Sequence, residues 1–132
     1  MVDALKRARS WLRSGGLLVD LHPVADPAFL IVGDTIAGPI DNGAAPSRHQ
    51  AATDAIAAAV REGLFRIADS TEFDFSTYAD TLDELQDYIV SEWREGHIAD
   101  KTLKRARELG ASADRKPCAR ERVSASRLVA TA

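Results

Sequence analysis

The sequence predicts one α/β or α+β domain of three layers, in which helices pack on a small mixed sheet. Apolar residues recur at helical spacing in several segments, two segments alternate apolar and polar residues as strands do, and one short segment is continuously apolar. Such an order of helix and strand patterns is typical of layered folds. No change of composition marks a boundary, so we expect a single domain over residues 1–132.

The first third of the chain predicts a helix, a strand and a hairpin. Residues 2–13 are expected to be helical, and residues 17–21 are expected to form a strand that is covered on both faces, because their apolar run is continuous. Gly33 followed by Asp34 suits the two-residue type II′ turn of a hairpin over residues 28–40. The inner face of the helix is expected to carry Leu5, Ala8, Trp11 and Leu12.

The middle of the chain predicts a helix followed by an alternating strand. Ser47 and Gln50 have the spacing of a capping box for an alanine-rich helix over residues 47–62, whose close packing is typical of a helix on a sheet. Residues 65–75 alternate, which predicts a strand with one face in solvent. The buried face of that strand is expected to carry Phe65, Ile67, Thr71, Phe73 and Phe75.

The last third predicts two helices and a closing strand. Thr81 and Glu84 form a second capping box, and Gly96 and Gly110 are suited to end the two helices. Residues 118–130 alternate again. The inner stripe of the first of these helices is expected to be Leu82, Leu85, Ile89 and Trp93; Val123, Ala125 and Val129 are expected to share one face of the strand, opposite Arg120, Arg122 and Ser124.

Composition excludes several classes of function. The net charge of −3 provides no field that attracts nucleic acid, and no apolar run reaches the ~20 residues that span a bilayer. We therefore expect neither a nucleic acid nor a membrane as partner. The N-terminal residues lack the apolar core of a signal peptide, and the single cysteine, Cys118, fits a reducing compartment, so a cytoplasmic location is expected. Lys116 and Arg120 beside Cys118 would favour its thiolate.

Asp20 and His22 are the candidate catalytic residues. They lie two positions apart at the end of the predicted strand, so they share one face, and the carboxylate would orient or charge the imidazole. The carboxyl edge of a sheet is also the usual ligand side of α/β folds. The alternative is structural: an acid that caps a turn and a histidine packed before Pro23.

Tyr78, Trp93 and His97 are candidate substrate-binding residues, because they fall in or beside the predicted helices of residues 81–109. The alternative for the two aromatic residues is a place in the core. The alternative for His97 is a ring that binds a free carbonyl group at a helix–helix corner. The three histidines and the scattered carboxylates show no metal-ligand spacing such as H-E-x-x-H or C-x-x-C, so we expect no metal site.

The segment Leu12, Arg13, Ser14, Gly15, Gly16 and residues 17–21 resembles a signature of the class I S-adenosylmethionine-dependent methyltransferases. In that family, a leucine, a basic residue, often a proline, and two glycines precede the hydrophobic fifth strand of a Rossmann-like fold. The resemblance implies that residues 47–62 are a crossover helix, residues 65–75 the sixth strand and residues 118–130 an antiparallel seventh strand. The hairpin of residues 28–40 and the helices of residues 81–109 would be insertions.

The glycine-rich turn and the acidic residue with which this family holds its cofactor have no counterpart in the sequence. The chain therefore resembles the C-terminal half of a methyltransferase without a cofactor site of its own, and we expect no methyl transfer by this chain alone. Two functions follow from the resemblance. The first is a binding or assembly module or a degenerate relic, and the second is the substrate-side half of a split small-molecule methyltransferase. In the second case, a partner chain supplies the half that binds S-adenosylmethionine.

The resemblance also implies an exposed strand edge. The fifth strand of the family pairs with the fourth and the seventh, and the fourth is absent from this sequence. Residues 17–21 contain neither lysine nor proline, the residues that usually protect an edge. Three covers for that edge remain open: the hairpin of residues 28–40, a second copy of the chain, or a partner. We expect a twofold homodimer, because isologous pairing covers both exposed edges at once.

Overall fold

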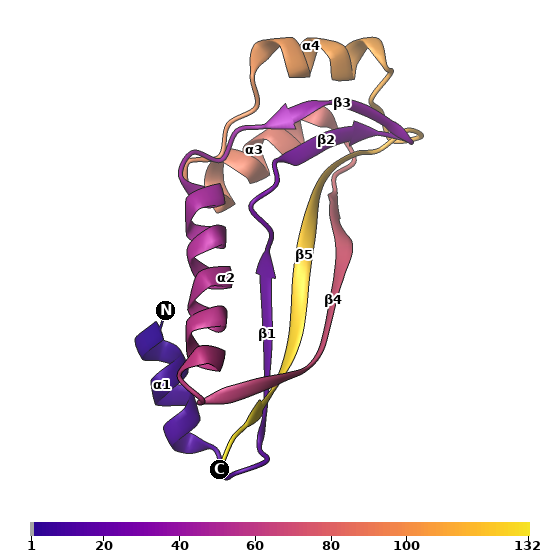
Figure 1. Ribbon diagram of the computed structural model, residues 1–132. Coiled ribbons are helices and arrows are strands. Elements are labelled where there is room, and N and C mark those ends of the chain that lie inside the picture. Colours follow the sequence, from indigo (N-terminus) through magenta and orange to yellow (C-terminus); the bar gives the residue numbers. More distant parts are fainter. Residues whose placement is uncertain (1) are drawn as a thin grey trace. The chain divides into compact units, whose positions relative to one another are not determined.

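The computed structural model describes residues 2–132, with side chains from Asp3 onward, as a mixture of four helices and five strands (Figure 1). In chain order the elements are α1 (Val2–Trp11), β1 (Leu17–Pro23), β2 (Ala28–Val32), β3 (Thr35–Ile40), α2 (Ala45–Arg61), β4 (Phe65–Tyr78), α3 (Leu82–Glu92), α4 (Asp100–Glu108) and β5 (Pro117–Ala130). The α/β character predicted from the sequence is confirmed.

The five strands form an antiparallel sheet around β5, which is 14 residues long. β5 pairs with β1 through its residues 123–129 and with β2 through its residues 117–120. β3 extends the sheet from β2, and β4 pairs with β5. The prediction of a mixed sheet is wrong: β1 pairs with the antiparallel β5, and the described residues give it no parallel neighbour.

The chain divides into two compact units. The first comprises Met1–Ala25, Ser47–Phe73 and Val123–Ala132, and the second comprises Asp26–Pro46 and Asp74–Arg122. β4 and β5 each contribute residues to both units.

In the first unit, α1 and α2 pack on one face of the strands. Leu5 of α1 and Ile56 of α2 meet Leu128 of β5 in one apolar cluster, which also includes Phe65. Ala55 and Ala59 are buried in the same cluster, and their small side chains let α2 approach the sheet closely. The described residues place no helix of this unit on the other face, so this unit has two layers where three were predicted.

The uncovered face corrects the prediction that residues 17–21 are buried on both sides. Leu17, Val19 and Leu21 are 58–63% exposed, because side chains alternate along β1 and only one face has a helical layer. Trp11 was expected on the inner face of α1, yet it is 77% exposed. Leu5 is instead the residue of α1 that is buried in the apolar cluster.

The inner face of β5 also differs from the prediction. In the first unit, Leu128, Ser126 and Ala130 are buried on the helix-covered side, whereas Ala125 and Val129 pair across the other face with Leu21 and Leu17. In β4 only Phe65 is buried; Ile67, Thr71, Phe73 and Phe75 are exposed. In β5 the alternation does not show which set of residues meets the helices. In β4 both sets are exposed over residues 66–75, so the alternation there does not mark a covered face.

In the second unit, α3 and α4 pack on the β2–β3 hairpin. The cluster joins Leu30 of β2, Leu85 of α3 and Leu103 of α4, with Ile98 between the helices. Leu82, Leu85 and Ile89 are buried as predicted, and Trp93 packs partly buried against them.

The turn predicted at Gly33 and the helix cap predicted at Thr81 are present in the structure, whereas the cap predicted at Ser47 is not. Gly33 has φ +59° while Asp34 does not have positive φ, as a type II′ turn requires. At α3, the backbone N–H of Glu84 donates to the Thr81 hydroxyl over 3.1 Å, so the predicted capping interaction is present. The box predicted at Ser47 is wrong, because α2 begins earlier, at Ala45.

Candidate functional site

Asp20 and His22 lie side by side on the helix-covered face of β1. Oδ2 of Asp20 is 2.5 Å from Nδ1 of His22, and their side chains are only 15% and 10% exposed. The contact follows from the strand itself, since residues i and i+2 point to the same side. Because a carboxylate only accepts, Nδ1 carries a hydrogen and Nε2 is the atom that faces away from Asp20.

Nε2 of His22 meets a hydroxyl from α2. Oγ1 of Thr53 lies 3.0 Å from this nitrogen, and the same oxygen lies 3.3 Å from the backbone carbonyl oxygen of His49, one helical turn earlier. Ala52 and Ala55 are buried near Thr53 in α2, and their small side chains allow this close approach of the helix to β1. The result is a continuous chain of hydrogen bonds from a carboxylate through an imidazole to a hydroxyl.

His22 and Thr53 line a cavity of about 210 Å³ within the first unit. Ile56, Ala57 and Ile67 provide apolar wall. The remaining lining is Ser70, Ser124 and Ser126, whose hydroxyl groups both donate and accept hydrogen bonds.

His49 also belongs to this region. Its Nδ1–H donates to the backbone carbonyl of Val24 over 3.2 Å. Partial burial is the main cause that lowers the pKa of His49 below its usual 6.5. The hydrogen bond to the Val24 carbonyl acts in the opposite direction, and the positive charge of Arg48 adds to the decrease. His49 is therefore a partly buried neighbour of the site and not a fully solvated residue.

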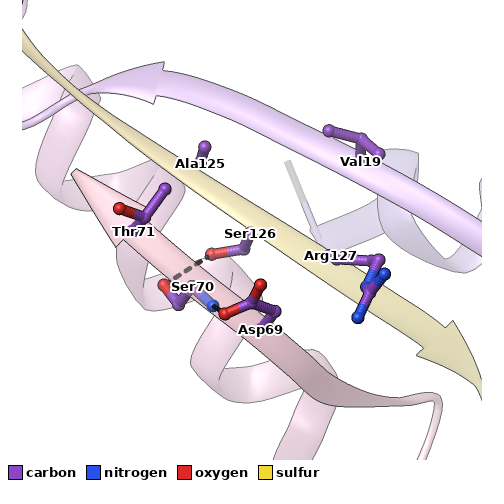
Figure 2. Close-up of a pocket in the computed structure, with 7 residues that line it drawn as sticks. All are labelled: Val19, Asp69, Ser70, Thr71, Ala125, Ser126 and Arg127. Atoms are coloured by element: carbon purple, nitrogen blue, oxygen red, sulfur yellow. Dashed lines mark hydrogen bonds between the residues drawn. The ribbon is translucent and has the colours of Figure 1, made fainter. Parts of the chain in front are cut away.

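A second hollow of about 170 Å³ lies where β1, β5 and β4 meet (Figure 2). Ser70 and Ser126 line it as well, and their hydroxyl oxygens are 3.2 Å apart across β4 and β5. The side chains of Val19, Asp69 and Arg127 also line this hollow. Ser70 and Ser126 therefore line both hollows.

The candidate substrate-binding residues are not brought to this site. Tyr78, Trp93 and His97 belong to the second unit and are absent from the lining of the two hollows. Tyr78 is exposed at the end of β4, and Trp93 packs against the core of its own unit. The backbone of His97 bridges to Asp41, with N–O distances of 2.7 and 2.9 Å, while its side chain is exposed.

Cys118 is buried in β5 of the second unit. Burial raises the pKa of its thiol, and this effect outweighs the Arg120 charge and the hydrogen bonds with Ser76 and Arg120, which act in the opposite direction. Arg120 thus acts in the direction that the sequence predicts, but burial outweighs it, so the pKa of the thiol is raised and not lowered.

Sequence reasoning missed Thr53 and the three serines. Residues 51–59 contain only two polar residues, Thr53 and Asp54. A hydroxyl group within an alanine-rich helix was therefore the sequence feature that could have indicated Thr53. Ser124 and Ser126 fall on one face of a strand at a spacing of two. Neither pattern indicates by itself which histidine or acid the hydroxyl groups meet.

Over residues 2–132, the histidine, cysteine and acidic side chains form no group of three or more that could hold a metal ion. None of the helices that the structure describes combines the length and the apolar character needed to cross a membrane. No family model matches the chain, and no curated protein or solved structure is significantly similar to it.

Proposed function

We propose that this chain is an assembly module that forms a homodimer by pairing its strand β1 with the same strand of a second copy. One observation carries the proposal: Leu17, Val19 and Leu21 are 58–63% exposed on a strand whose outer edge has no partner among the described residues. An unprotected strand edge offers a row of free backbone donors and acceptors to another strand.

The residues of β1 favour pairing with another strand over exposure of this edge to water. Full burial of an exposed leucine or valine contributes roughly 1.5–3 kcal/mol, and these side chains, which are 58–63% exposed, have more than half of that still to gain. The one charged residue between Leu17 and Leu21 is Asp20, which points toward the helices and is held by His22. The outer surface of the strand is thus neutral and apolar.

The register that suits a twofold pair is centred on Val19. It places Val19 opposite Val19 of the second copy, and Leu17 opposite Leu21 of that copy, so an apolar ladder forms across the axis. A register centred on Asp20 would instead place two carboxylates opposite each other, which is unfavourable. The sequence of β1 therefore complements itself in one register.

The mass in solution tests the proposal. Light scattering at low micromolar concentration should give about twice the 14.3 kDa chain mass. Val19→Lys should yield monomer, because it introduces two like charges on the axis. Val90→Lys on α3 is the matched control, since Val90 is 60% exposed and lies in the second unit. A monomeric unmodified chain, or equal behaviour of the two variants, would contradict the proposal.

The split methyltransferase is the second candidate. The resemblance implies a seventh strand that is antiparallel to the fifth and lies beside it. β5 pairs antiparallel with β1 and also pairs with β4, the segment assigned to the sixth strand. This order supports the methyltransferase-like relationship.

Calorimetry with S-adenosylmethionine distinguishes the candidates. The assembly module alone should show no binding. Binding that appears only after a partner chain with the missing half is added would favour the split enzyme, with the β1 edge as the natural junction. Micromolar binding by the isolated chain would contradict both proposals.

A further inference from the structure

We propose that Asp20, His22 and Thr53 form an acid–imidazole–hydroxyl site that hydrolyses small carboxylic esters. The inference does not depend on methyl transfer or on pairing through β1, because all three residues and the cavity lie within the first unit. Their connectivity is that of a hydrolytic triad: the carboxylate contacts one ring nitrogen and the hydroxyl contacts the other.

The distances place each group in reach of its neighbour. Oγ1 of Thr53 lies 3.0 Å from Nε2 of His22, within the range in which a base takes a proton from a nucleophile, and Oδ2 of Asp20 contacts Nδ1 at 2.5 Å. Asp20 and His22 are largely buried, so the carboxylate holds the ring in one orientation. Thr53 is exposed at the cavity and is therefore accessible to a substrate.

Counting hydrogens indicates where the Thr53 hydroxyl points. The hydroxyl has one hydrogen and two acceptors within reach, Nε2 of His22 at 3.0 Å and the carbonyl oxygen of His49 at 3.3 Å. With a neutral imidazole whose hydrogen is on Nδ1, Nε2 is a free acceptor at the shorter distance. The hydroxyl then donates to the ring and leaves its lone pairs for attack.

The cavity indicates the class of substrate. Its volume of about 210 Å³ is sufficient for a short acyl group. Ile56, Ala57 and Ile67 provide the apolar wall against which such a group packs. Ser70 and Ser126 share one hydrogen bond, so the Ser124 hydroxyl and the one of those two that does not donate to the other are the lining donors for a developing oxyanion.

The reaction has two balanced halves. Oγ1 of Thr53 attacks the ester carbonyl carbon while Nε2 takes the hydroxyl proton; the ester C–O bond breaks, and the alcohol leaves with the proton that Nε2 returns. Water then attacks the acyl group on Thr53 and gives one proton to Nε2. The carboxylic acid departs, and that proton restores the Thr53 hydroxyl. Thr53 and His22 are the catalytic residues, and Asp20 is a positioning residue.

Hydrolysis of p-nitrophenyl acetate by the full chain tests the site. The expected result is a burst of p-nitrophenolate equal to the protein concentration, with one acetyl group located on Thr53 by peptide mass spectrometry. Thr53→Val should abolish the burst and lower the rate at least ~100-fold, while Thr53→Ser should restore both. His97→Gln is the matched control for the unspecific action of an exposed imidazole, and it should change nothing.

Asp20→Asn separates positioning from a structural role. It should lower kcat far more than it changes KM, and it should shift the low-field NMR signal of the His22 Nδ1 proton. The circular dichroism spectrum should stay the same. An unmodified chain no faster than Thr53→Val, an acetyl group on another residue, or an equal loss in His97→Gln would overturn the proposal.

Discussion

Gly38 of β3 lies directly against Thr102 of α4. A Cβ atom on Gly38 would come 2.6 Å from Oγ1 of Thr102 and 3.2 Å from its Cγ2, closer than atoms in proteins approach without a shift. Thr102 is 1% exposed, and its hydroxyl lies 3.5 Å from the carbonyl oxygen of Pro39. The absence of a side chain at Gly38 therefore sets how closely α4 packs on the hairpin in the second unit.

Gly38→Ala should destabilise the protein by about 1–3 kcal/mol, because a methyl group has no room beside the buried Thr102. Urea unfolding measures the loss. Thr102→Ala should recover part of it in a double-mutant cycle, since the two residues are in contact. Equal unfolding midpoints for Gly38→Ala and the unmodified protein would show that α4 moves aside freely.

The Thr81 hydroxyl stabilises the start of α3, where it accepts from the backbone N–H of Glu84. Thr81→Ala should cost about 1 kcal/mol of unfolding free energy, which is typical of a lost N-cap. Thr81→Ser keeps the hydroxyl and should retain most of the stability in the same urea titration. Equal losses in both variants would assign the effect to the methyl group instead of the cap.

Features set by neighbours in the sequence were predictable. The Thr81 cap and the Gly33 turn depend on two to four consecutive residues, and both are present in the structure. The proximity of Asp20 and His22 was also predictable, because it follows from the two-residue repeat of a strand.

Features set by distant contacts were not predictable. The exposure of Val19 depends on which face of β1 the helices cover, and an apolar run contains no information on this point. Likewise, Thr53 meets His22 across 31 positions of sequence, through the packing of α2 on β1. The sequence therefore predicted two residues of the site, Asp20 and His22, but not Thr53.

Cys118 should react slowly with a water-soluble disulfide reagent at pH 8 in the folded protein. Burial limits access to the sulfur and raises the pKa of the thiol, so little thiolate is available. The measurement is the rate of thiol modification with and without urea. Ala113→Cys, at an exposed position, supplies a reactive thiol in the same chain as a control. Comparable rates for the two thiols in the folded state would contradict the prediction.

His49 should make the stability of the protein fall on mild acidification. Partial burial lowers the pKa of its ring in the folded state, whereas the unfolded chain keeps a value near 6.5. The unfolded state therefore takes up a proton first as the pH decreases. Stability due to this residue is complete above about pH 6.5, decreases as the pH falls below it, and levels off below the pKa of the folded state.

Urea unfolding between pH 8 and pH 5 measures this dependence. His49→Gln should weaken it, because an amide N–H can still donate to the Val24 carbonyl and carries no titrating proton. His97→Gln, at an exposed ring in the other unit, should leave the dependence unchanged. If the two variants follow the same pH curve as the unmodified protein, the acid sensitivity originates elsewhere, and the burial of the His49 ring has no thermodynamic consequence.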